Sequence, residues 1–128
     1  MVCLDTSFII DFLKKDKTAI SKEINKNERI TVPSPVIVEL IRGLGTKHSY
    51  IEERQGIIDF INALNTLDLN KTSSIKAGDI ESELRKMGEI IDIMDILIAA
   101  IAITNNETLI TKNLKHFSKI PELKIESY

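Results

Sequence analysis

Residues 92–111 read DIMDILIAAIAITNNETLIT, and this stretch says more about the fold class than any other part of the sequence. Residues 92–104 are apolar apart from Asp92, Asp95 and the final Thr104, a pattern typical of a buried helix. Asn105-Asn106 predicts a turn, and residues 108–111 predict a short strand with an apolar centre. A buried helix that leads directly into a buried strand favours an α/β fold.

The same alternation of strands and helices extends to both ends of the chain. The predicted strands cover residues 2–5, 29–32, 66–69, 108–111 and 123–126. Helices are predicted from residue 6, from an N-cap and first-turn proline at Ser34-Pro35 to Gly43 or Gly45, and over 51–64, 72–87, 92–104 and 114–117. The sequence therefore predicts one α/β domain over residues 1–128, with a mainly parallel sheet of about four or five strands covered by helices on both faces.

Composition limits the possible functions without deciding between them. With 128 residues and 43% hydrophobic residues, the chain has enough apolar material for one core. A net charge of −2 gives no overall basic surplus for nucleic acid, and 5% aromatic residues with no tryptophan leave little for stacking on bases. Any nucleic-acid binding would have to rely on bound cations and on a local basic rim.

The N-terminal region and the single cysteine bear on the cellular compartment. Cys3 excludes an internal disulfide, fits a reducing compartment, and lies in an apolar run where a buried side chain is expected. The chain opens with a strand pattern in place of a signal peptide, and its longest apolar run, 96–103, falls short of the roughly 20 residues that span a bilayer. We therefore expect a cytoplasmic protein.

Four carboxylates in apolar surroundings are the candidate functional residues: Asp5, Glu39, Asp92 and Asp95. Burying a carboxylate costs several kcal/mol, roughly, unless it is paired, hydrogen-bonded or bound to a metal. No lysine or arginine occurs from residue 90 to residue 110. Asp5 ends the first predicted strand, and Thr111 and Asn113 end the fourth. Parallel α/β sheets bind their ligands at this edge.

Each acid also has a purely structural interpretation. Asp92 could be the N-cap of the helix that follows it, and Asp95 could be an acid that favours the first turn of that helix. Glu39 could pair with Arg42 on the next turn of its helix, and Asp5 could cap the first helix. The functional interpretation rests on all four acids meeting at one place.

Acids that meet at one place point to a particular kind of metal site. Converging carboxylates raise one another's pKa values, and a divalent cation removes that penalty. Oxygen donors suit Mg²⁺ or Mn²⁺. Zinc is not indicated, because no cysteine pair occurs and His48 and His116 are isolated, so we expect surface or packing roles for both histidines.

Four segments resemble the motifs of PIN domains, in order and over nearly the whole chain. They are LDTSFIID at 4–11, VELIRG at 38–43, DILIAAIA at 95–102 and LITKNLKHF at 109–117. The resemblance implies a three-layer α/β/α fold and a metal-dependent endoribonuclease acting on RNA such as tRNA or rRNA. It also implies a homodimer and, for the VapC-type toxins of this family, a cognate antitoxin that neutralises the toxin.

Carried over by position, the resemblance gives each candidate residue a role. Asp5, Glu39 and Asp95 match the metal-binding acids, while Thr111 and Ser7 match hydroxyl residues beside them. Asn113 stands where many relatives have a fourth acid, and His116 replaces an acid before Phe117. Asp92, one helical turn from Asp95, is expected to supply the missing charge. The candidates for RNA contacts at the rim are Lys14, Lys15, Arg42, Lys47, Lys112 and Lys115, which could equally form a solvated face.

Two other functions remain open at this stage. A phosphohydrolase with Asp5 as covalent nucleophile would need a second acid two residues later, where this chain has Ser7. A non-catalytic or highly substrate-restricted PIN domain that binds RNA or protein would fit the neutral Asn113. The apolar residues of 10–24 and 51–64 could form dimer or antitoxin interfaces, or could belong to the core.

Overall fold

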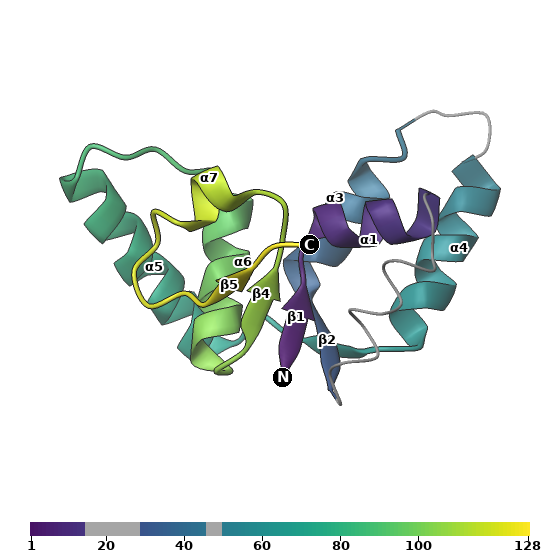
Figure 1. Ribbon diagram of the computed structural model, residues 1–128, viewed down its shortest axis with the longest axis horizontal. Coiled ribbons are helices and arrows are strands. Elements are labelled where there is room, and N and C mark those ends of the chain that lie inside the picture. The colour runs from purple at the N-terminus through teal and green to yellow at the C-terminus, as the bar shows by residue number, and fades with distance from the viewer. Residues whose placement is uncertain (15–28, 46–49) are drawn as a thin grey trace.

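The computed structural model describes residues 1–14, 29–45 and 50–128 (Figure 1). Within them lie five strands: β1 (Val2–Leu4), β2 (Ile30–Pro33), β3 (Asn65–Leu67), β4 (Thr108–Ile110) and β5 (Ile125–Glu126). They form one parallel sheet in the order β3-β2-β1-β4-β5. The predicted parallel sheet of four or five strands is confirmed.

Helices cover both faces of this sheet. On one side lie α1 (Thr6–Lys14), α3 (Ser34–Arg42) and α4 (Tyr50–Asn62). On the other lie α5 (Lys71–Lys86), α6 (Ile93–Thr104) and α7 (Leu114–Phe117) (Figure 1). The α/β/α arrangement of three layers is therefore also confirmed. Among the described residues, no helix is long and apolar enough to cross a membrane.

The strand order creates a switch point between β1 and β4. The chain leaves β1 toward β2 and β3, then returns to place β4 on the opposite side of β1. Parallel sheets of this kind bind ligands in the crevice where the direction of winding reverses, beyond the carboxyl ends of the strands. Because Leu4 pairs with Ile110, the next residues of the two strands, Asp5 and Thr111, stand side by side at that point.

Helix α6 lies at the centre of the packing, as its apolar sequence predicts. It packs against α5 and α3 and against the sheet. Ala99, Ala100 and Ala102 are fully buried and carry only a methyl group, so the neighbouring elements can approach closely. Cys3 in β1 is also fully buried, as expected for a small apolar side chain. The core therefore holds the first turn of α6, which carries Asp95, firmly against the sheet.

Two helix starts differ from the sequence prediction. Ser34 is the first residue of α3 and Pro33 occupies the N-cap position, so the predicted serine cap is wrong. The Ser34 Oγ instead accepts a hydrogen bond from the Leu69 N–H at 3.1 Å. The N-cap of α5 is Asn70, which accepts from the Ser73 N–H at 2.9 Å, so β3 ends at Leu67 and not at residue 69. The chain turns early because the cap draws Asn70 away from the sheet.

Candidate active site

Asp5 is the central acid of the carboxyl-end edge of the sheet. Its backbone N–H donates to the Ile110 carbonyl at 3.1 Å, which continues the pairing of β1 with β4. Its Oδ2 accepts hydrogen bonds from the Thr111 Oγ1 at 2.6 Å and from the Ser7 Oγ at 3.3 Å. Burial raises the pKa of Asp5, while these hydrogen bonds oppose the rise. The structure thus brings Asp5, Ser7 and Thr111 together as the sequence predicts.

Glu39 is held by a residue that sequence reasoning did not select. It lies in α3, and its Oε1 accepts a hydrogen bond from the Thr6 Oγ1 at 2.7 Å. Within the described residues Glu39 makes no ion pair with Arg42, so the alternative interpretation as a surface pair is wrong. Thr6 directly follows Asp5, and two adjacent hydroxyl residues after an acid were the signal that could have identified it.

Asp95 lies in the first turn of α6, and its pKa is raised in part by the charges of the other acids. Burial and the negative charges of Asp5, Glu39 and Asp92 together raise the pKa of Asp95 to about 6, while a hydrogen bond with His116 opposes the rise. Its side chain is 13% exposed. Carboxylates from three separate elements thus converge on one region, as the functional interpretation requires.

Asp92 caps the helix that carries Asp95. Its Oδ1 accepts a hydrogen bond from the Met94 N–H at 2.9 Å, and it occupies the N-cap position of α6. The capping interpretation is therefore confirmed. The side chain is also exposed and close enough for its charge to raise the pKa of Asp95. A role in metal binding stays a prediction.

Asn113, between β4 and α7, and His116, in α7, complete this edge. The Asn113 N–H donates to the Thr111 Oγ1 at 2.9 Å, and its Nδ2 lies 3.1 Å from the His116 Nδ1. The His116 Nδ1 also lies 3.4 Å from the Asp95 Oδ2. If this nitrogen carries a proton it donates to Asp95, and if it does not it accepts from the Asn113 amide, so the tautomer of His116 decides between the two hydrogen bonds. The expectation of a surface or packing histidine missed this contact, because only the fold brings α7 against α6.

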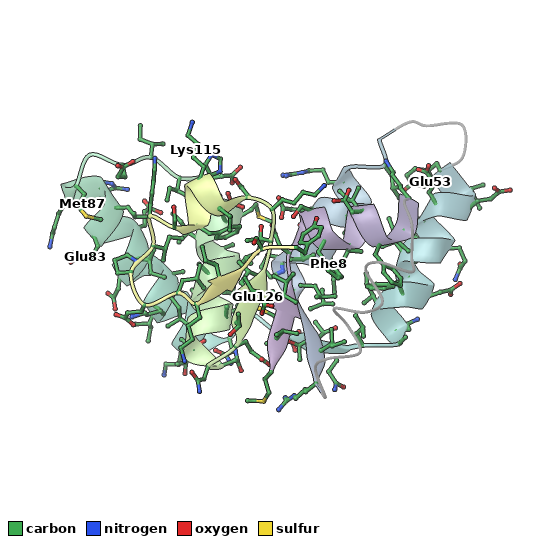
Figure 2. The ribbon with its side chains drawn as sticks, viewed as in Figure 1. Phe8, Glu53, Glu83, Met87, Lys115 and Glu126 are labelled. Carbon is green, nitrogen blue, oxygen red and sulfur yellow. The ribbon has the colours of Figure 1, made fainter. Side chains whose placement is uncertain are left out.

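The expected RNA-binding cations are distributed around this edge. Lys14, Arg42, Lys112 and Lys115 are all exposed, and Figure 2 shows Lys115 on α7 at the outer rim. Lys15 and Lys47 lie outside the described residues. Lys112 forms an ion pair with Asp11 of α1, whose side chain also accepts a hydrogen bond from Tyr128. Sequence reasoning selected neither of these two partners.

An apolar groove of about 350 Å³ begins at Glu39 and continues between α1, α3 and α4. Helix α1 contributes Ile10 and Leu13, and α4 contributes Gly56 and Ile57. Several of these residues belong to the segments in which the sequence suggested interface residues. The part of 10–24 beyond residue 14 lies outside the described residues.

The donor chemistry of the site fits a hard divalent cation. Its acids offer only oxygen atoms, the ligands that Mg²⁺ and Mn²⁺ prefer, and their mutual repulsion is what a cation would relieve. Over the ranges that the structure describes, no three Asp, Glu, His or Cys side chains already form a compact cluster. The acids are therefore gathered in one region without being closed around a centre.

Comparison with known proteins identifies the class of this fold and site. The PIN domain family model matches residues 2–123, so the chain belongs to the PIN-domain family. The chain is 33% identical over 129 residues to the ribonuclease VapC2 of Rickettsia felis, a match that covers 98% of this chain and 96% of that protein. Within the PIN-domain family it therefore belongs with the VapC ribonucleases.

A second relative and a solved structure agree with this assignment. The chain is 31% identical over 128 residues to the tRNA(fMet)-specific endonuclease VapC of Salmonella typhimurium, with 98% of this chain and 96% of that one covered. The crystal structure of VapBC2 from Rickettsia felis bound to a promoter DNA fragment superposes with a TM-score of 0.92 at 29% identity. That match covers 100% of this chain and 99% of the other. The resemblance seen in the sequence is confirmed.

Proposed function

We propose that this chain is a Mg²⁺- or Mn²⁺-dependent endoribonuclease and the toxin of a VapBC toxin–antitoxin pair. The observation that carries the proposal is the convergence of three acids at the switch point of the sheet: Asp5 directly after β1, Glu39 in α3 and Asp95 in α6. The names of the relatives, ribonuclease and tRNA-specific endonuclease, support RNA as the substrate.

The metal would be held by Asp5, Glu39 and Asp95, with Asp92 and Asn113 in support. When bound, such an ion supplies charge stabilisation and an activated water for phosphodiester hydrolysis. The remaining residues orient the acids. Thr111 and Ser7 donate to the Asp5 carboxylate, which leaves its other oxygen, Oδ1, as a candidate ligand atom. Thr6 orients Glu39 in the same way from the first turn of α1.

The nucleophile determines which RNA ends are produced. Attack by water on a backbone phosphate leaves a 5′-phosphate and a 3′-hydroxyl, whereas attack by the neighbouring 2′-hydroxyl leaves a 2′,3′-cyclic phosphate. We expect the first pair of ends. The backbone would be bound by exposed cations around the acidic centre, for which we propose Arg42, Lys14, Lys112 and Lys115.

A cognate antitoxin would cover the apolar groove between α1, α3 and α4. The solved relatives include toxin–antitoxin complexes, and the groove offers an apolar floor with Glu39 and Glu53 along its length. A partner segment with apolar side chains and a basic residue complements this lining. Because Glu39 belongs both to the groove and to the acidic centre, such a partner would block the active site directly. We also propose that the toxin forms a homodimer.

The experiment that tests the proposed activity is cleavage of total cellular RNA by the purified chain, with Mg²⁺ or with EDTA. Asp5→Ala and Asp95→Ala serve as variants, and Lys86→Gln, on the exposed side of α5, serves as a matched surface control. We expect discrete, metal-dependent cleavage that both acid variants lose and the control retains. Cleavage that persists in EDTA or in both acid variants would contradict the proposal.

A second candidate function is a PIN domain that binds metal and RNA without cutting. Two observations favour it: Asn113 is neutral, and the acids do not form a compact cluster within the described residues. Mg²⁺ binding with intact RNA in every lane would favour this alternative, whereas cleavage by the purified chain would exclude it.

A further inference from the structure

Lys112 stands apart from the other rim cations because its backbone is part of the acidic centre. It follows Thr111, whose hydroxyl donates to Asp5, and its own N–H donates to the Ser7 Oγ at 3.3 Å. Ser7 in turn donates to the same Asp5 oxygen. The backbone of Lys112 is therefore fixed within two hydrogen bonds of the central acid.

The ammonium group of Lys112 is fixed as well, by two residues from distant parts of the chain. It pairs with the Oδ2 of Asp11 and lies 5.5 Å from the centre of the Tyr128 ring, within the range of a cation–π contact. The Tyr128 hydroxyl donates to the same Asp11 oxygen at 2.7 Å. Asp11 lies one helical turn after Ser7, so α1 presents both residues on one face toward Lys112.

Tyr128 is itself held by contacts with two residues of α1, Phe8 and Asp11. Its ring contacts Phe8 edge to face, with centroids 4.9 Å apart, and Figure 1 places the C-terminus beside the start of α1. Burial and the hydrogen bond to Asp11 raise the pKa of Tyr128, so the phenol remains a donor at neutral pH.

Asp11 and Lys112 differ in how much of each side chain is exposed to solvent. The Asp11 side chain is 12% exposed, whereas the Lys112 side chain remains 47% exposed. A largely buried acid thus holds a cation whose side chain stays about half exposed, and the backbone of that lysine is bonded to the residues around Asp5.

We propose that Asp11 and Tyr128 are positioning residues that hold the Lys112 ammonium at the acidic centre as a contact for a phosphate of the RNA backbone. This inference rests on the proposed function, and it assigns to the C-terminal residue a role in substrate binding. The alternative is a purely structural role, in which the three side chains only pack residue 128 against α1. The alternatives differ in whether Tyr128 influences RNA binding through Lys112.

The test measures binding of fluorescein-labelled bulk tRNA in EDTA, where cleavage is silent, over a series of KCl concentrations. Lys112→Gln is expected to weaken binding and to lower the slope of log Kd against log salt by roughly 0.7–0.9, the value for one phosphate contact. Lys112→Arg, which keeps the charge, should restore most of the slope. Tyr128→Phe should weaken binding about two- to fivefold, less than the loss of the charge itself, while Tyr50→Phe is the matched control.

The double variant Tyr128→Phe with Lys112→Gln decides between a positioning role and a purely structural one. If Tyr128 acts through Lys112, the tyrosine substitution has no further effect once the lysine is gone. An equal loss in both backgrounds, or no loss in either, would overturn the inference, provided that the melting temperatures match. Wild-type cleavage of RNA, measured separately, identifies which idea has failed. If the wild type cleaves RNA but the variants bind tRNA as tightly as the wild type does, only this inference is overturned. If the wild type neither cleaves nor binds RNA, the proposed function is overturned as well.

Discussion

A carboxylate is buried at each end of the strands, at the carboxyl-end edge of the sheet and at the amino-end edge, and the two carboxylates differ in their hydrogen bonds. At the carboxyl-end edge, Asp5 accepts hydrogen bonds from two hydroxyl groups and lies near further acids. At the amino-end edge, Glu107 is 3% exposed, and its Oε1 accepts one long hydrogen bond of 3.3 Å from Thr31. Its Oε2 has no hydrogen-bond partner in the part of the chain that the structure describes.

The difference shows that burial of an acid does not by itself mark an active site. Glu107 lies beside the Cys3 thiol, where burial and the Glu107 charge raise the pKa of the cysteine. Asp5 accepts hydrogen bonds from hydroxyl groups that orient it, and it lies close enough to Asp95 for the two charges to interact. It does so at the edge where parallel sheets bind ligands. Convergence from separate elements, rather than burial, defines the site.

The largest effect should follow from Asp5→Asn. The amide keeps the shape of the side chain but removes the charge that a divalent cation needs, so RNA cleavage should fall by more than about a hundredfold. Glu107→Gln, the same change at the other edge, should leave cleavage unaltered. Gel analysis of RNA cleavage rates compares the two variants, and similar losses in both would break the distinction between the edges.

Thr111→Val tests whether the hydroxyl groups orient the central acid. Valine matches the shape of threonine, so the packing is preserved while Asp5 loses its shortest hydrogen bond, of 2.6 Å. We expect cleavage to fall about 10- to 100-fold, the usual range for residues that orient metal ligands. The steady-state rate at saturating Mg²⁺ measures this effect. An activity equal to that of the wild type would show that the hydroxyl has no such role.

The raised pKa of Asp95 predicts a pH dependence of stability in the metal-free protein. Between pH 3.8 and about 6 the folded state holds the proton more tightly than the unfolded chain, so the free energy of unfolding falls as pH rises through this window. The loss should reach about 3 kcal/mol, since each unit between the two pKa values is worth about 1.4 kcal/mol. Urea unfolding in EDTA across pH 4–7 should show this slope in the wild type. Parallel profiles for the wild type and Asp95→Asn would contradict the prediction.

The smallest effect should come from Glu107→Gln on stability. A neutral amide is less costly to bury than a carboxylate with one long hydrogen bond, so the variant should gain about 1 kcal/mol. Thermal unfolding in EDTA measures the change. A clear loss of stability would mean that the Glu107 charge has a partner that stabilises the fold.

The sequence predicts the fold well because periodicity and spacing determine it. The apolar strands and the helix over residues 92–104 require a parallel sheet, and an acid at the end of β1 then has to face the end of β4. The boundaries that failed, at Ser34 and Leu69, depend on local polar contacts: the Ser34 hydroxyl binds the Leu69 N–H instead of capping α3, and Asn70 caps α5. The pattern of apolar residues does not encode these contacts.

The site residues that belong to a known sequence motif could be predicted. Contacts between residues far apart in the sequence could not, because only the fold brings such residues together. Asp5, Glu39 and Asp95 follow from the motifs, and their proximity agrees with them. The contacts of His116 with Asp95 and of Tyr128 with Asp11 join residues 21 and 117 positions apart. Nothing in the local sequence signals either pair.

Titration of the purified chain with Mn²⁺ in the absence of RNA, followed by electron paramagnetic resonance, measures directly whether the converging acids bind a metal. The account predicts a saturable site in the wild type and in Glu107→Gln, and its loss or strong weakening in Asp5→Asn. The absence of saturable binding in the wild type, or equal binding in Asp5→Asn, would contradict the claim that the converging acids form a metal centre.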